Sequence, residues 1–180
     1  IYSLVDTAFV GTLGTSASGA VGVVFGFMAI LQAVGFLFGQ GSGSILSREL
    51  GSQDEEKASE TASTGFFGAF LVSIVVAVVC FIFLEPLGVL LGASGENAGL
   101  LLLVCQYLLG LIIGLPFDNM AKYIAGFLGM DSNYRLVVTG MTVATVTNIA
   151  GDIIVVALLG GDMFMLGLTT SVSRMMYFAA

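Results

Sequence analysis

The sequence predicts an all-α membrane protein built as a six-helix transmembrane bundle, and three observations lead to that prediction. Of the 180 residues, 57% are hydrophobic and only 9% are charged, with a mean hydropathy of +1.06. A water-soluble domain carries far more charge, so this chain is expected to lie in lipid. The apolar residues form six long stretches without the alternating polarity of barrel strands. In lipid, such stretches satisfy their backbone hydrogen bonds as helices.

The six apolar stretches are the expected helices of one transmembrane domain over residues 1–180. They cover residues 1–13, 17–46, 62–84, 99–130, 136–159 and 163–180. The four inner stretches reach or exceed the roughly 20 residues that cross a bilayer core as helix. The first and last are shorter. Because the chain begins at Ile1 and ends inside an apolar run, we expect both of these helices to be truncated.

Local signals predict where several helices begin, end or bend. Gly51 is expected to end the second helix. Ser52, followed three residues later by Glu55, predicts a capping box at the start of the third. Pro86 follows the third stretch, and Pro116 lies inside the fourth, where it is expected to kink the helix.

Glycine is abundant, with 25 residues, and several glycines are spaced by four. The spaced pairs are Gly22 with Gly26, Gly35 with Gly39, Gly39 with Gly43, and Gly110 with Gly114. This spacing lets membrane helices approach closely. The run GQGSGS at residues 39–44 follows no strand and lacks the lysine of a phosphate-binding loop, so close packing is the better interpretation.

The basic residues fall on alternate loops. Arg48 and Lys57 lie in the loop 47–61, and Arg135 closes the loop 130–135. Cytoplasmic loops carry an excess of Lys and Arg, so both loops are expected to face the cytoplasm from a multi-pass inner (plasma) membrane protein. Arg174 lies inside the last stretch and is expected to extend its side chain toward the cytoplasmic interface.

Composition also excludes several kinds of function. The net charge of −7, from 12 acidic and 5 basic residues, argues against nucleic acid as a partner. The chain has no histidine, which removes imidazole from any proton relay or metal site. Cys80 and Cys105 are isolated, without metal-binding spacing, and are expected to be small core residues.

A carboxylate and an amide interrupt the apolar stretch 136–159. Asn148 and Asp152 are four residues apart and therefore share one helix face. A charge within the membrane is costly and is kept mainly where it works or pairs. The two side chains can bind a cation, or they can simply hydrogen-bond to neighbouring helices. If Asp6 of the first stretch shares their pocket, the two carboxylates would take up a proton or a hard cation such as Na⁺.

Other polar residues also lie in apolar stretches. Asp118 and Lys122 have the spacing of a helical ion pair. Asn119 faces another direction and can line a pathway or support the site. A threonine in a membrane helix usually bonds to its own backbone, although Thr169 or Thr170 can also serve as a ligand.

Five segments carry a resemblance to a known family. They are residues 5–14 (VDTAFVGTLG), 47–51 (SRELG), 90–97 (LLGASGEN), 131–137 (DSNYRLV) and 147–155 (TNIAGDIIV). In this order and at these spacings, they resemble the first half of the multidrug and toxic compound extrusion (MATE) transporters. The resemblance spans the whole chain.

The resemblance implies a transporter of about twelve helices in two related bundles, an arrangement common among secondary transporters. This chain would be the N-terminal bundle, and the C-terminal half of the transporter would be its partner. In the family, an acidic residue of helix 1, an Asn/Asp pair of helix 5 and, in some members, a threonine of helix 6 form a cation site. Carried over by motif, these are Asp6, Asn148, Asp152 and Thr170, with Tyr2 nearby.

The expected function is therefore secondary active antiport, exporting amphipathic organic cations or drugs in exchange for Na⁺ or H⁺. Asp6, Asn148 and Asp152 would hold the Na⁺ if sodium is the coupling ion. No enzyme activity and no other cofactor are expected. A lipid-linked oligosaccharide flippase of the same superfamily is the alternative, although basic residues are scarce. Two rivals come from other classes of protein. One is an intramembrane aspartyl protease using Asp6 with Asp152 or Asp162, and the other is a passive channel or scaffold.

Overall fold

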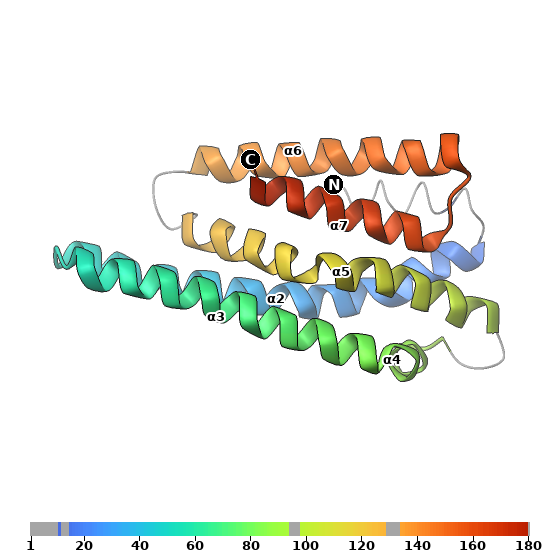
Figure 1. Cartoon of the computed structure of the whole chain (residues 1–180), viewed down its shortest axis with the longest axis horizontal. Coiled ribbons are helices and arrows are strands. Elements are labelled where there is room, and N and C mark those ends of the chain that lie inside the picture. The colour runs from blue at the N-terminus through green and yellow to red at the C-terminus, as the bar shows by residue number, and fades with distance from the viewer. Residues whose placement is uncertain (1–10, 12–14, 94–97, 129–133, 180) are drawn as a thin grey trace.

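The structure is a computed structural model that describes residue 11 and residues 15–93, 98–128 and 134–179. Its helices are α2 (Thr15–Gly51), α3 (Glu55–Ile82), α4 (Leu84–Leu90), α5 (Ala98–Leu128), α6 (Tyr134–Ile153), the π-helical segment η1 (Ile154–Leu159) and α7 (Met163–Ala179). No strand occurs within these ranges. Figure 1 shows the long helices running side by side along one axis. The all-α class that the sequence predicts is confirmed.

The apolar stretches correspond to these helices. Within the described ranges, four helices are long and apolar enough to cross a membrane, at Thr15–Gly51, Glu55–Ile82, Gly99–Gly126 and Arg135–Leu159. The expected helix at residues 1–13 falls almost wholly outside the described residues. The expected loop 47–61 is wrong in its extent, because α2 continues to Gly51 and α3 already begins at Glu55. The polar residues there favour helix as strongly as the apolar ones before them.

The turn between α2 and α3 is capped by Asp54 rather than by Ser52. An Asp54 carboxylate oxygen accepts a 3.2 Å hydrogen bond from the backbone nitrogen of Lys57. The chain reverses at Gln53, whose φ is 62°, and Ser52 lies directly after α2, with its backbone nitrogen bonded to carbonyls of the last turn of that helix. The predicted capping box is therefore wrong, whereas the predicted end of α2 at Gly51 is confirmed.

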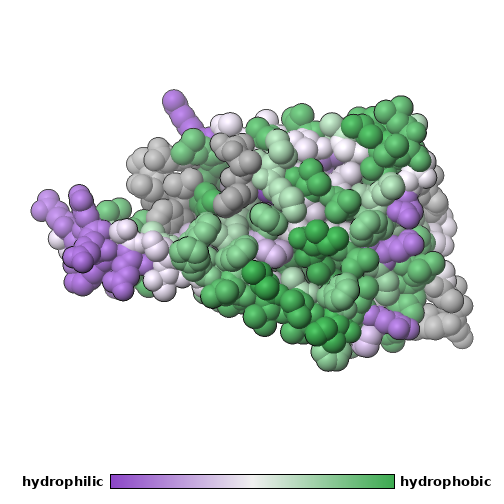
Figure 2. All heavy atoms as spheres, viewed as in Figure 1, coloured by the Kyte–Doolittle hydropathy of each residue, from purple (hydrophilic) through white to green (hydrophobic). Residues whose placement is uncertain are grey.

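The surface divides between a hydrophilic tip and a hydrophobic body. Figure 2 shows hydrophilic atoms gathered at the end where α2 meets α3, and hydrophobic atoms across the middle of the visible face. The exposed polar residues of the tip include Arg48, Gln53, Glu55, Glu56 and Lys57. Along α3, large apolar side chains such as Phe67 and Val75 are 62% and 61% exposed. Such a surface is stable only against lipid or other protein.

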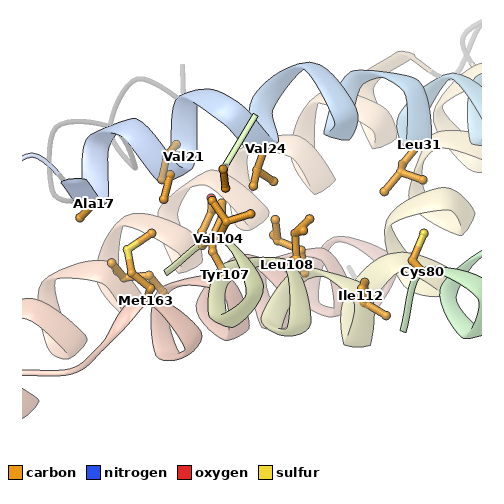
Figure 3. Packing of buried hydrophobic residues seen from close by; sticks show 14 of the residues in the cluster. Ala17, Val21, Val24, Leu31, Cys80, Val104, Tyr107, Leu108, Ile112 and Met163 are labelled. Carbon is orange, nitrogen blue, oxygen red and sulfur yellow. The ribbon is translucent and has the colours of Figure 1, made fainter. Parts of the chain in front are cut away.

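The core is centred on α5, which packs against α2, α3 and α7. Figure 3 shows side chains from α2, α3, α5 and α7 meeting in the largest buried cluster. Its labelled members are Ala17, Val21, Val24, Leu31, Cys80, Val104, Tyr107, Leu108, Ile112 and Met163. Cys80 is thus a small core residue, as predicted, and Cys105 is half-buried.

Glycines let α5 approach its two main neighbours closely. A Cβ atom on Gly39 of α2 would lie 2.7 Å from the carbonyl oxygen of Tyr123 on α5. A Cβ on Gly110 of α5 would lie 2.7 Å from the carbonyl oxygen of Phe164 on α7. Both distances are below van der Waals contact with backbone atoms, so only glycine fits. A Cβ atom on Gly22 would have no described atom within 4 Å. The four-residue spacing of glycines therefore does not by itself identify where two helices pack closely.

Candidate functional site

The candidate site lies where α6 and α7 pack together. Asn148 and Asp152 are on one face of α6, and they are 1% and 0% exposed. The helices meet closely here because α6 has a glycine between these side chains. A Cβ atom on Gly151 would lie 3.0 Å from Cβ of Thr169 on α7. This close approach brings the threonines of α7 against the polar face of α6.

Both threonines of α7 contact the polar pair. The hydroxyl of Thr169 donates a 2.7 Å hydrogen bond to Oδ1 of Asp152. The side-chain nitrogen of Asn148 donates a longer bond, 3.4 Å, to the hydroxyl of Thr170. Both hydroxyls also lie within hydrogen-bond distance of the carbonyl oxygen of Leu166, at 2.8 Å and 3.2 Å. A hydroxyl has one proton, so Thr169 can donate to Asp152 or to Leu166 but not to both at once.

Two acceptor oxygens of this group remain unmatched. Oδ1 of Asn148 and Oδ2 of Asp152 are buried and have no hydrogen-bond partner among the described residues. An unsatisfied buried polar atom costs about 1–3 kcal/mol, and more when it is charged. Oxygen acceptors in this situation suit a proton or a hard cation, whereas they repel an anion. The arrangement can therefore neutralise a bound cation or be neutralised by a proton.

The backbone changes character directly after Asp152. The α-helix ends at Ile153, and the next six residues are π-helical, ending at Gly160 with a left-handed φ of 56°. Short π-helical segments within helices are frequent at functional sites. The sequence predicts an unbroken helix over 136–159, so this change of geometry was not foreseen.

The remaining predicted site residues lie elsewhere or outside the description. Asp6 and Tyr2 fall among residues 1–10, which the structure does not describe. Asn119 of α5 is fully buried, and its amide nitrogen donates a 2.9 Å bond to the hydroxyl of Ser73 on α3. Ser73 in turn donates to a backbone carbonyl of its own helix at 2.6 Å. The structure thus joins Asn119 to α3 and not to the group on α6 and α7.

A charged cluster lies between α5 and α7. Nζ of Lys122 is 3.6 Å from Oδ1 of Asp118, which confirms the predicted ion pair within α5. Nε of Arg174 on α7 is 3.1 Å from the same oxygen. Arg174 is only 6% exposed, so the expectation that it extends to the interface is wrong. Its guanidinium is held inside the bundle because a buried carboxylate is within reach.

Sequence reasoning therefore missed two contacts. Thr169 binds Asp152 directly, whereas the family pattern indicates Thr170. Arg174 pairs with Asp118 across two helices. The sequence shows that Thr169 and Thr170 are adjacent and that Arg174 and Asp118 have opposite charges. It does not show how α7 is rotated against α5 and α6, and this rotation decides which side chains meet.

Comparison with known proteins gives consistent matches over almost the whole chain. The family profile described as MatE matches residues 1–154. The multidrug export protein MepA of Staphylococcus saprophyticus is 29% identical over 177 residues, which is 97% of this chain and 38% of that protein. MepA of Staphylococcus aureus matches with the same identity and coverage. The chain spans about two fifths of the length of these relatives.

Solved structures show the same fold. An inward-facing multidrug resistance MATE family transporter superposes with a TM-score of 0.89 at 23% identity, covering 98% of this chain and 39% of that one. A MATE protein in the bent conformation superposes with a TM-score of 0.90 at 22% identity, covering 99% and 39%. The profile match covers well over half of the chain, and these structures share its arrangement of helices. The chain belongs to the multidrug and toxic compound extrusion (MATE) family.

Proposed function

We propose that this chain is the N-terminal bundle of a secondary active antiporter that exports amphipathic organic cations or drugs in exchange for Na⁺ or H⁺. Its relatives MepA are named multidrug export proteins. The proposal places the chain in the inner (plasma) membrane, with a second helical bundle as its partner. The tip between α2 and α3 would face the cytoplasm.

The observation that carries the proposal is the pair of unmatched oxygens on α6. Oδ1 of Asn148 and Oδ2 of Asp152 are buried without hydrogen-bond partners among the residues described. A purely structural Asn/Asp pair would satisfy both oxygens on neighbouring helices. A cation site, by contrast, needs acceptors that protein donors leave open. The resemblance to the family implies that Asp6 would add a second carboxylate.

Asp152 and Thr169 would couple binding of the cation to export of the substrate through the charge of the carboxylate. An ionised Asp152 in the bundle is stabilised by the hydroxyl of Thr169. When a proton or Na⁺ neutralises the carboxylate, the attraction for that hydroxyl weakens, and Thr169 can donate to the carbonyl of Leu166 instead. The cation then favours one packing of α6 and α7 over another. Coupling requires only that the ion and the substrate favour different states.

The test is efflux of a fluorescent cationic dye by the full-length transporter in vesicles, under an imposed Na⁺ or pH gradient. Asp152→Asn removes the ionisable group while keeping the shape of the side chain. Asp162→Asn is the matched control, because Asp162 is exposed and its side chain only caps the start of α7. We expect gradient-driven efflux to be lost in Asp152→Asn and retained in Asp162→Asn.

The gradient that drives efflux identifies the coupling ion. Equal efflux in wild type and Asp152→Asn would show that Asp152 is structural. No efflux from the wild type under either gradient would contradict the antiport proposal and favour the flippase alternative.

A further inference from the structure

A cavity of about 10 Å³ lies where α5 and α7 pack together, and it shares Thr170 with the candidate cation site. A water molecule needs a cavity of about 10–15 Å³, so this one is just large enough for a single water. Its apolar wall comes from Met28 of α2 and from Leu111 and Leu115 of α5. A buried water also needs two to four polar partners, and the rest of the wall can supply them.

Three buried side chains with oxygen atoms line the cavity, namely Asp118, Thr170 and Ser171. Oδ2 of Asp118 has no hydrogen-bond partner among the described residues, whereas Oδ1 is the oxygen in both ion pairs of this carboxylate. The hydroxyl of Ser171 donates to the carbonyl of Gly110 at 2.6 Å, and its oxygen can still accept a hydrogen bond. Arg174 also lines the cavity and is already paired with Asp118. The oxygens therefore offer one strong acceptor, the carboxylate, and two hydroxyls.

Thr170 connects this cavity to Asn148 of the candidate site. Its hydroxyl oxygen accepts the 3.4 Å bond from the side-chain nitrogen of Asn148. Its proton is held loosely, because the carbonyl oxygen of Leu166 is 3.2 Å away. That carbonyl is closer, at 2.8 Å, to the hydroxyl of Thr169. Thr170 can therefore donate to a water in the cavity while it accepts from Asn148.

We propose that one water molecule binds in this cavity, accepts a hydrogen bond from Thr170 and donates one to Oδ2 of Asp118. The oxygen of Ser171 would accept the second proton of the water. The water joins the candidate cation site to the charged cluster of α5 and α7, through a chain that runs from Asn148 to Thr170, to the water and to Asp118. Binding of the water is independent of the proposed function, whereas the role of the chain rests on it.

The charge of Asp118 gives this chain of hydrogen bonds a direction. An ionised carboxylate only accepts, so each donor in the chain points toward it, and Asn148 offers its nitrogen to Thr170. Oδ1 of Asn148 is then left for the cation. A flipped amide would turn its NH₂ group into the site instead, and donor hydrogens repel a cation. Asp118 is therefore a positioning residue for Asn148, and the low dielectric of the bundle strengthens such a chain.

The water is tested by a crystal structure of the full-length protein at a resolution that shows ordered water molecules. We expect one water within about 2.5–3.0 Å of both Oδ2 of Asp118 and Oγ1 of Thr170. Thr170→Val should lose this water, because a methyl group replaces one of its partners, and Thr170→Ser should keep it. Thr169→Val is the matched control and should keep it as well, since the described lining includes Thr170 but not Thr169.

The positioning role is tested by the concentration of the coupling ion that gives half-maximal dye efflux. In Thr170→Val this concentration should rise about threefold, the effect of losing one neutral hydrogen bond, while the maximal rate stays nearly unchanged. Thr170→Ser should restore the wild-type value. Asp118→Asn should raise the concentration as well, because the chain loses the charge at its end. If Asp118→Asn fails to fold, the two Thr170 variants decide the matter.

A wild-type structure without a water between Asp118 and Thr170 would overturn the proposal, whether or not the protein transports. So would a water that remains in Thr170→Val. If the water is lost in that variant and the half-maximal concentration of the ion does not change, Asp118 does not position Asn148. Absence of gradient-driven efflux from the wild type would count against the antiport proposal instead, and the crystal structures would still decide whether the water binds.

Discussion

The hydroxyl of Thr169 on α7 donates a 2.7 Å hydrogen bond to Oδ1 of Asp152 on α6, and this is the shortest link from either threonine to the polar face of α6. The neighbouring Thr170 contacts the same face only through Asn148, at 3.4 Å. The two threonines are adjacent in the chain, yet Thr169 hydrogen-bonds to Asp152 and Thr170 to Asn148. Their roles can therefore be separated by substitution.

Thr169→Val should lower gradient-driven efflux about tenfold, because Asp152 loses a charge-assisted hydrogen bond worth about 1.5–3 kcal/mol. Thr169→Ser keeps the hydroxyl and should retain most of the activity. Thr170→Val should have the smaller effect, since its contact is long. Dye efflux from vesicles measures all three, and a larger loss in Thr170→Val than in Thr169→Val would contradict this assignment.

Asp118→Asn should destabilise the protein by about 3–5 kcal/mol, because it leaves the buried cations Lys122 and Arg174 without their carboxylate. Adding Arg174→Gln to that variant should recover part of the loss. Thermal unfolding of the purified proteins in detergent measures both effects, and the double-mutant cycle gives the coupling between the two residues. Strictly additive losses would mean that the 3.1 Å pair contributes nothing.

Gly110→Ala should lower the unfolding temperature, since the new methyl group would lie 2.7 Å from a backbone oxygen of α7. Overpacking of this kind costs about 1–3 kcal/mol. Gly22→Ala is the control, because no described atom lies within 4 Å of its Cβ position. It should be neutral or slightly stabilising, since alanine favours helix over glycine by about 1 kcal/mol. Similar unfolding temperatures for both variants would show that α5 and α7 can separate without cost.

The cap at the start of α3 should weaken in acid. The hydrogen bond from the Lys57 side chain, 2.6 Å from Oδ2, lowers the pKa of the Asp54 carboxyl below its ordinary value of 3.8. A carboxyl whose pKa is lowered by folding stabilises the folded state above the ordinary value. That contribution is lost as the pH falls through the lowered pKa.

Hydrogen exchange of the amides in the first turn of α3 measures this effect. We expect their protection factors, corrected for the intrinsic pH dependence of exchange, to fall at acid pH in the wild type. Asp54→Ala should show low protection at every pH. Protection that is independent of pH in both proteins would rule out the cap as a contributor.

The sequence predicts the number and order of the described long helices well, because the length of an apolar run depends only on neighbouring residues. It fails at the α2–α3 tip, where polar residues such as Glu49 and Glu56 continue both helices. An apolar stretch of sequence ends at the edge of the bilayer core, whereas a helix ends where its terminal backbone groups are capped. The two boundaries coincide only by chance.

The sequence predicts which residues of the candidate site share a face of one helix, but not which residues of two helices meet. The spacing of Asn148 and Asp152 places both on one side of α6, and the structure agrees. Which hydroxyl meets Asp152 depends on the rotation of α7, which is set by the tight contact between Gly151 and Thr169. Such a contact between helices leaves no periodic signal in the sequence. The roles of Asp6 and Tyr2 stay predictions.

The length of α2 has a practical consequence. Its 37 residues extend about 55 Å at 1.5 Å per residue, whereas a bilayer core is roughly 30 Å thick. Together with the start of α3, it forms a helical hairpin with Gln53 at its turn. The exposed polar residues around that turn should keep it outside the apolar part of a micelle or nanodisc. A small rigid protein grafted at that turn through continuous helices would give electron cryomicroscopy a feature by which to align the particles.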